Sequence, residues 1–103
     1  MAEKPPEFNA QKRTAERLAR GVNFSLALAT GDTIASQSVT AKDESDNDVS
    51  ASLIASAGHT STEVTWTFLP WGTVGSTYYV RVVATTTNGE VLVRVVRLEI
   101  TGA

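Results

Sequence analysis

The last third of the chain carries the clearest alternation of apolar and polar residues. Two runs rich in Val, Tyr and Leu, within residues 72–101, flank the tripeptide Thr87-Asn88-Gly89. Asn-Gly between β-prone runs is a strong hairpin signal because both residues tolerate positive φ angles. The apolar residues that share one face are Tyr78, Val80, Val82, Ala84, Val96, Leu98 and Ile100. The pattern predicts a half-buried antiparallel hairpin, which needs the rest of the chain to cover its apolar face.

Four earlier segments, residues 22–29, 33–42, 49–56 and 62–69, are also predicted to be strands. The first and the last alternate cleanly, and Trp66 in the last is the best candidate for a central core aromatic. Sequences typical of turns separate the segments. These are Thr30-Gly31-Asp32, Ala57-Gly58-His59 and Pro70-Trp71-Gly72. The other candidate core residues are Val22, Phe24, Leu26, Leu28, Ile34, Val39, Val49, Leu53, Ile54, Val64 and Phe68.

The N-terminal residues follow a different pattern. Pro5 and Pro6 favour an extended arm, and Phe8 could anchor this arm on the body of the protein or on a neighbour. Residues 9–20 are predicted to form one short helix, with Asn9 as its N-cap and Gly21 just past its end. The helix has a narrow apolar face, and an isolated helix of this length is marginal in water.

The basic residues of this predicted helix leave two interpretations open. Four cations accompany a single acid, Glu16, and they are Lys12, Arg13, Arg17 and Arg20. The helix could lie solvated on the β body, or the arm and helix could become ordered on a neighbouring subunit. Contact with nucleic acid is only weakly indicated, because no aromatic residue accompanies the cations.

Length and composition indicate a leader at residues 1–21 and a single all-β body at residues 22–103. A net charge of −2 suggests no general attraction to nucleic acid or to an anionic membrane. The sequence has no cysteine, no apolar run of 18 residues and no signal-peptide-like apolar core. These features exclude disulfides and Cys-based metal sites, predict no membrane span, and lead us to expect folding in a cytoplasm.

Residues 43–48 form an acidic segment, Asp-Glu-Ser-Asp-Asn-Asp, whose oxygens would suit calcium. An EF-hand loop needs Gly at its sixth position and Glu at its twelfth, whereas counting from Asp43 places Asp48 and Ile54 there. Clusters of Asp, Asn and Ser are ordinary loop material, so the segment is predicted to be a solvated connection between strands.

Catalysis is not expected. The one histidine, His59, is predicted to lie exposed in a turn without a partner for general-base work. The sequence contains no G-x-S-x-G, H-E-x-x-H or P-loop pattern, and no base is placed to activate a serine or threonine. We therefore expect neither enzymatic activity nor a cofactor.

About six strands at regular spacing predict an antiparallel β-sandwich with an N-terminal arm and one short helix. The segment Thr77-Tyr78-Tyr79-Val80 follows a Pro and Gly turn at the head of a long strand. It looks like the tyrosine corner of immunoglobulin-like and fibronectin type III sandwiches. By that resemblance, the Tyr78 hydroxyl would bond to the backbone near residues 70–72.

Three motifs resemble, in order and spacing, a family of small tailed-bacteriophage virion proteins. They are Gly31-Asp32-Thr33-Ile34-Ala35-Ser36, residues 66–69 leading into Gly72-Thr73-x-Gly75-x-x-Tyr78, and Thr85-Thr86-Thr87-Asn88-Gly89. The opening Glu3-Lys4-Pro5-Pro6-Glu7 is also similar. The family is labelled phage fiber-tail adaptor or minor structural protein, and the resemblance implies a single immunoglobulin-like domain. The chain departs from the family pattern at residues 9–20, at residues 43–48 and at Trp71.

The resemblance implies a structural protein of the virion that decorates or cements the capsid or the head–tail region. Its partners would be major capsid, head–tail or tail proteins, and it would be a homo-oligomer or present in many copies. The expected contact residues are Pro5, Pro6, Phe8, Arg13, Arg17, Arg20 and Trp71.

Two other functional classes stay open. One is a carbohydrate- or receptor-binding sandwich on a fibre, in which an exposed Trp71, Tyr79 and the acidic loop would form the site. Another is a module of a larger adhesin, against which Met1 and the terminal Gly102-Ala103 argue.

Overall fold

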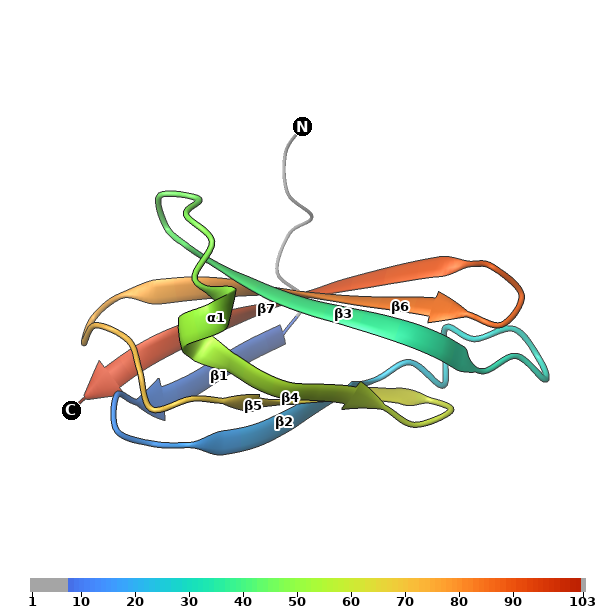
Figure 1. The fold of residues 1–103 in the computed structure, drawn as a ribbon, viewed down its shortest axis with the longest axis horizontal. Helices are drawn as coiled ribbons and strands as arrows, with labels where there is room; N and C mark the ends of the chain where they lie inside the picture. The colour runs from blue at the N-terminus through green and yellow to red at the C-terminus, as the bar shows by residue number, and fades with distance from the viewer. Residues whose placement is uncertain (1–7, 103) are drawn as a thin grey trace.

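The computed structural model describes residues 8–102 (Figure 1). In this part of the chain, seven strands and one short helix form two packed β-sheets. The elements are β1 (Phe8–Arg13), β2 (Leu18–Asn23), β3 (Ile34–Asp43), α1 (Ser50–Leu53), β4 (Ile54–His59), β5 (Glu63–Phe68), β6 (Thr77–Thr86) and β7 (Val91–Gly102). The predicted β-sandwich is confirmed at this level, but its one short helix is not at the predicted position.

One sheet has the strand order β1-β7-β6-β3 and the other has the order β2-β5-β4. All the paired strands run antiparallel except β1 and β7, which run parallel with Ala10 opposite Leu98 and Lys12 opposite Ile100. The sheets contact each other where β3 lies beside β4, and α1 joins these two strands on that side of the molecule (Figure 1). The opposite side, between β1 and β2, is more open.

The predicted hairpin is confirmed and supplies much of the core. Its strands β6 and β7 pair from Thr77 opposite Glu99 to Thr85 opposite Val91, and Gly89 takes a positive φ of 91° in the turn. The inward residues of both strands are buried against β5, where Trp66 meets Phe68 edge to face at 5.6 Å between ring centroids. The core residues are Val22, Phe24, Ile34, Ala41, Leu53, Val64, Trp66, Phe68, Tyr78, Val80, Val82, Ala84, Val96, Leu98 and Ile100.

The helix predicted for residues 9–20 is wrong. Residues 8–13 and 18–23 are strands, and the turn between them lies in the middle of the predicted helix. The turn is closed by the Arg13 N–H, which donates to the Glu16 carboxylate at 2.7 Å, and by the Glu16 N–H, which donates to the Arg13 carbonyl. Helix propensity is a weak preference in so short a segment, and pairing with β7 and β5 overrides it. The expected boundary between residues 21 and 22 falls inside β2.

The strand predicted for residues 22–29 ends at Asn23. The Asn23 side-chain oxygen accepts a hydrogen bond from the Ser25 N–H, and the Phe24 carbonyl accepts from Ala27 and Leu28. These local bonds turn the chain, as Asn commonly does. Phe24 is buried, but Leu26, predicted to share its face, is fully exposed.

The strand predicted for residues 49–56 is also only partly present. Asp48 accepts hydrogen bonds from the backbone and hydroxyl of Ser50, and one helical turn, α1, follows before β4 begins at Ile54. The turn predicted at residues 57–59 is instead part of β4, which contains a bulge between Ala55 and Gly58. Aspartate and serine favour local backbone bonds of this kind over a strand ladder, which explains the short helix.

The head of β6 has the tyrosine arrangement that the sequence suggested. The Thr73 N–H donates to the Tyr78 hydroxyl at 3.1 Å, one residue beyond the predicted span 70–72. The Trp71 ring lies 5.4 Å from the Tyr78 ring, and Gly72, at a φ of +126°, lies against Ile100. This contact ties the loop between β5 and β6 to the core.

Replacing Tyr78 by Phe removes this hydroxyl while keeping the ring. We expect the free energy of unfolding to fall by about 1 kcal/mol, the typical net value of one hydrogen bond. Tyr79→Phe is the matched control, since Tyr79 lies on the outward face of the same strand, half-buried, and should change stability by less than about 0.5 kcal/mol. Denaturant unfolding measures both; equal effects would contradict the role of the Tyr78 hydroxyl.

Candidate partner-binding groove

A groove of about 400 Å³ lies on the open side of the sandwich, between β1 and β2. Both strands are at the edge of their sheets among the residues that the structure describes. The groove is lined by Asn9, Ala10, Gln11, Arg20, Gly21, Val22, Trp66, Phe68 and Val96. Its volume is in the range of about 300–1,000 Å³ that is typical of binding pockets.

Trp66 lines the groove and carries a buried hydrogen-bond donor. Its side chain is 2% exposed, and within residues 8–102 no acceptor is found for its indole N–H. A buried polar group without a partner costs free energy, so most buried Trp N–H groups are bonded. The Trp66 N–H is therefore a buried donor behind the wall of the groove, and the Phe68 ring beside it is fully buried.

Arg20 supplies the positive charge of the groove. Its backbone pairs with Trp66 of β5, so the side chain starts on the inward face of an edge strand and then reaches solvent. One of its N–H groups donates to the Ala19 carbonyl at 2.8 Å. A guanidinium has five such donors, so several remain for an anionic or carbonyl partner.

Lys12 fixes the position of β1 beside the groove. Its side chain is 2% exposed, and the ammonium donates to the carbonyls of Arg13 at 2.7 Å, Thr14 at 3.1 Å and Trp71 at 3.2 Å. Burial lowers the pKa of Lys12, and the nearby Glu16 carboxylate acts in the opposite direction. Three carbonyl acceptors need three N–H donors, so this geometry requires the charged form.

The predicted contact residues do not form one cluster. Pro5 and Pro6 lie outside the described residues, and Phe8 is the first residue of β1. Arg13 and Arg17 are exposed on either side of the turn between β1 and β2, whereas Arg20 lies further along, at the groove. Trp71 is half-buried, not exposed, because it packs on the core beside Tyr78. The Lys12 ammonium donates to the carbonyls of both Trp71 and Arg13, so these two residues lie at the same end of the molecule.

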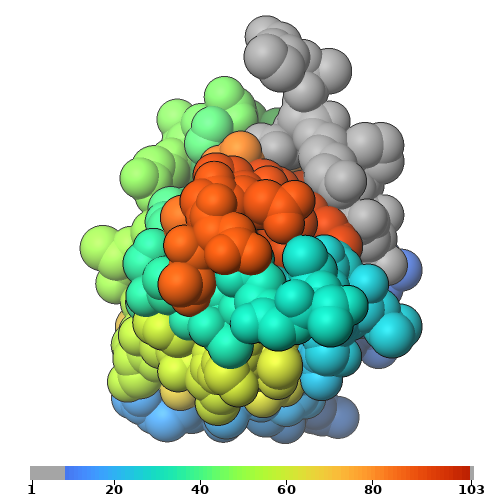
Figure 2. Space-filling model, turned by 90° about the vertical axis from the view of Figure 1, so that its right-hand side faces the viewer, coloured from blue at the N-terminus to red at the C-terminus, as the bar shows by residue number. Residues whose placement is uncertain are grey.

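Three connections meet at the other end of the sandwich (Figure 2). The loop after β2 bonds to the turn after β4 through Phe24 and Thr62, and to the β6–β7 turn through Thr33 and Thr87. Asp32 is the centre of this arrangement, because its carboxylate accepts from the N–H groups of Thr33 and Asn88. Burial would raise the pKa of Asp32, but hydrogen bonds from the Thr86 side chain and from the backbone of residues 33, 87 and 88 lower it overall.

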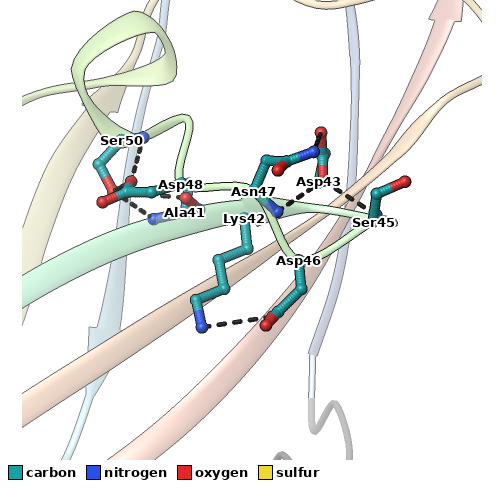
Figure 3. A network of polar contacts seen from close by, with 8 residues as sticks. All are labelled: Ala41, Lys42, Asp43, Ser45, Asp46, Asn47, Asp48 and Ser50. Atoms are coloured by element: carbon teal, nitrogen blue, oxygen red, sulfur yellow. Dashed lines mark hydrogen bonds and ion pairs between the residues drawn. The ribbon is translucent and has the colours of Figure 1, made fainter.

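Three aspartate side chains of the acidic loop make hydrogen bonds or an ion pair with neighbouring residues of the same segment (Figure 3). Asp43 accepts from the N–H groups of Ser45 and Asn47, Asp48 accepts from Ser50, and Asp46 pairs with Lys42 at 3.3 Å. Hydrogen bonds from Asn47 lower the pKa of Asp43, and those from Ser50 lower the pKa of Asp48. Among the described residues, no group of three His, Cys, Asp or Glu side chains is placed to hold a metal ion.

His59 is exposed, as predicted, but it lies in β4 and bonds to the side chain of Gln37 on β3. This contact links the edges of the two sheets on the closed side of the sandwich. Within the described residues, no helix is long and apolar enough to cross a membrane.

A comparison with known protein families identifies the chain. Residues 12–99 match the model of the Gp77 family, described as the podophage GP4 fiber-tail adaptor protein gp77. The chain belongs to this family. It is therefore a structural component of a phage virion, in the tail, and the expected family and virion location are confirmed. A comparison with curated protein sequences gave no match.

Membership in the Gp77 family supports a location in the tail of the virion. It gives no support to the expected role in decorating the capsid. A structural adaptor family also implies a non-enzymatic role, in agreement with the sequence. Adaptors of this kind work in multi-copy assemblies, so surfaces that can receive a neighbour are the features of interest. The groove between β1 and β2 is a candidate for such a surface.

Two features of this region were not found from the sequence. The sequence predicts Lys12 among the four cations of a helix and Trp66 in the core, but it does not reveal the buried ammonium of the one or the N–H of the other that has no acceptor within residues 8–102. The signal that could have revealed Lys12 is the alternation of Ala10 and Lys12 with Asn9, Gln11 and Arg13, which fits a strand as well as a helix.

Replacing Lys12 by Met keeps an unbranched apolar side chain but removes the three N–H donors. We expect the free energy of unfolding to fall by about 2 kcal/mol or more, because three carbonyls lose a charged donor. Lys42→Met is the control, since the Lys42–Asp46 pair is solvent-exposed and worth at most about 1 kcal/mol. Thermal unfolding followed by circular dichroism compares them; a loss no larger for Lys12→Met than for Lys42→Met would contradict this role.

The Asp32 carboxylate should make the fold acid-sensitive. Its folded-state pKa lies below the ordinary value of 3.8, so its stabilising contribution is present above pH 3.8 and is lost as the pH falls through the folded-state pKa. Asp32→Asn should therefore flatten the fall in melting temperature between about pH 4 and pH 2. Asp46→Asn, in the exposed loop, is the control. If the melting temperature of Asp32→Asn falls with pH as steeply as that of the wild type, the Asp32 carboxylate is not the acid-sensitive group.

Proposed function

We propose that this protein links a tail fibre to the tail of a podophage virion and acts as a rigid spacer without chemistry of its own. The family match over residues 12–99 carries the proposal. A two-sheet sandwich with loops at both ends and two strand edges along one side is suited to hold two neighbours at a fixed separation. The partners would be a tail protein and a fibre protein, with several copies of the adaptor in each virion.

We also infer that the sandwich is immunoglobulin-like. Within its sheet, the strand order β2-β5-β4 corresponds to strands B, E and D of that fold. In the other sheet, the order β7-β6-β3 corresponds to G, F and C. The first strand joins β7 instead of β2, which is the one departure from the constant-type arrangement. The bond between the Tyr78 hydroxyl and the Thr73 N–H supports this assignment, since a tyrosine at this corner is typical of such domains.

The contacts with fibre and tail would involve the N-terminal segment with Pro5 and Pro6, and the end of the sandwich at the β1–β2 turn. Arg13 and Arg17 are exposed there, and both can pair with acidic groups of a neighbour. Phe8 and Trp71 were expected to contribute as well. Trp71 would act through the loop that it anchors on Tyr78, because its own ring is half-buried.

The alternative of a carbohydrate- or receptor-binding module loses its main support. That alternative needed an exposed Trp71 as an aromatic platform, whereas Trp71 packs on the core. The acidic loop, its second expected component, uses its carboxylates for internal hydrogen bonds and an ion pair. We therefore retain the adaptor function alone.

Disrupting the gene in the phage that encodes it should give virions with complete heads and tails but without fibres, visible by electron microscopy. Complementation with the wild-type gene should restore the fibres. Arg17→Glu should reduce fibre occupancy about tenfold or more, because reversing a contact charge places like charges together. Lys42→Glu, on the opposite sheet edge, is the matched control. Virions that keep their fibres without this protein would refute the proposal.

A further inference from the structure

Val95 is buried on the outer face of the four-stranded sheet, away from the core. Its neighbours on the inward face of β7, Val96 and Leu98, contact the second sheet and belong to the core. Val95 faces the opposite way and lies outside this core, yet it is only 1% exposed. Along the same outer face of β7, Val93 is half-buried and Val91 is 61% exposed. A cover other than the second sheet therefore lies over Val95.

The described neighbours of Val95 supply this cover on one side only. There, β6 places Arg81 directly opposite Val95. On the other side, the pairing of β1 with β7 begins with Phe8 opposite Val96. Continuing this parallel register by one residue would bring Glu7 beside Val95, on the outer face of the sheet. The missing part of the cover thus points to the segment that precedes Phe8.

The charges on this face favour an acidic segment. Arg81 on β6 and Arg97 on β7 both lie on the outer face, next to the buried valine. Residues 1–7 carry two acids, Glu3 and Glu7, and one lysine. Two carboxylates can therefore meet two guanidinium groups, and the long stems of the arginines can cover apolar surface at the same time.

The length of this segment fits a single crossing of the sheet. Neighbouring strands lie about 4.8 Å apart, so the path from β1 over β7 to β6 is about 10 Å. Residues 3–7 span about 12 Å in an extended polyproline conformation. Pro5 and Pro6 have no N–H to donate to a strand ladder, which favours a crossing of the sheet over a longer β1.

We propose that residues 1–7 pack across the outer face of the β1-β7-β6-β3 sheet of their own chain. The segment covers Val95, and its two acids lie beside the arginines of β6 and β7. The chain's own segment is favoured over that of a second copy because Glu7 is joined covalently to Phe8. So short a connection gives an effective concentration in the millimolar range or above. The inference concerns a single chain and does not depend on the proposed adaptor function.

This docking changes what the segment offers to a neighbour. A free arm has to be ordered when it binds, at a cost of about 1–2 kcal/mol per residue for the backbone. Held on the sheet, Pro5 and Pro6 are presented in a fixed position. A protein that contacts these prolines then also contacts the sheet around them, so the segment and the sheet form one preorganised surface.

The test is the reactivity of a cysteine at residue 95 of the full-length protein, which has no cysteine of its own. Val95→Cys keeps a small apolar side chain, and its rate of reaction with iodoacetamide reports how often this position becomes uncovered. We expect Val95→Cys to react about a hundredfold or more slowly than Val91→Cys, the exposed control on the same face of β7.

Charge reversal then tests the identity of the cover. Glu3→Lys combined with Glu7→Lys should raise the rate of Val95→Cys about tenfold or more, because like charges then meet, and should leave that of Val91→Cys unchanged. Adding glutamate at both arginines of the outer face, Arg81 and Arg97, should restore the rate to within about threefold, since the charges are then exchanged across the contact.

NMR of the wild-type protein gives a measurement without substitutions. Contacts should appear between the Val95 methyl groups and residues 1–7 in a sample that sedimentation shows to be monomeric. Contacts that appear only when the protein self-associates would assign the cover to a second copy and overturn the proposal. A rate for Val95→Cys that equals that of Val91→Cys, or that ignores the charge reversal, would overturn it as well. These measurements use neither fibre nor tail, so their outcome is separate from that of the gene disruption, which tests the adaptor function.

Discussion

The parallel pairing of β1 with β7 is the constraint on which the rest of the N-terminal half depends. This pairing places Lys12 opposite Ile100, inside the molecule, where its ammonium can be accommodated only by three carbonyls. Those carbonyls come from the β1–β2 turn and from the loop that carries Trp71, so one side chain fixes two connections. The positions of β2, of the groove and of the exposed arginines all follow from this turn.

The sequence predicted the strands that are stabilised by the core and failed where a tertiary contact decides the structure. Regular alternation in β5, β6 and β7 reflects burial on one face, and such strands can be recognised from their own residues. Residues 9–20 contain good helix formers and plausible caps, and nothing local reveals that β7 offers an edge to pair with. At α1, the bonds of Asp48 to Ser50 oppose the strand that Leu53 and Ile54 suggest.

The candidate site was predictable only in part for the same reason. Exposure of Arg13, Arg17 and Arg20 followed from their charge, but their distribution depends on the turn that replaces the helix. Trp66 is a core residue whose N–H has no acceptor within residues 8–102, and it lines the groove only because β1 and β2 leave a gap between them. A gap between two edges is a property of the sheet arrangement, and no residue pattern encodes it locally.

The shared direction of β1 and β7 also has a mechanical consequence. The start of β1 and the end of β7 lie at opposite ends of the strand pair. A pulling force applied at these two points would slide the strands past each other, so that every hydrogen bond of the ladder resists at the same time. In an antiparallel hairpin pulled at its open end, the bonds would break one after another. An adaptor that transmits load along β1 and β7 would therefore resist extension in shear, the geometry in which a short ladder is strongest.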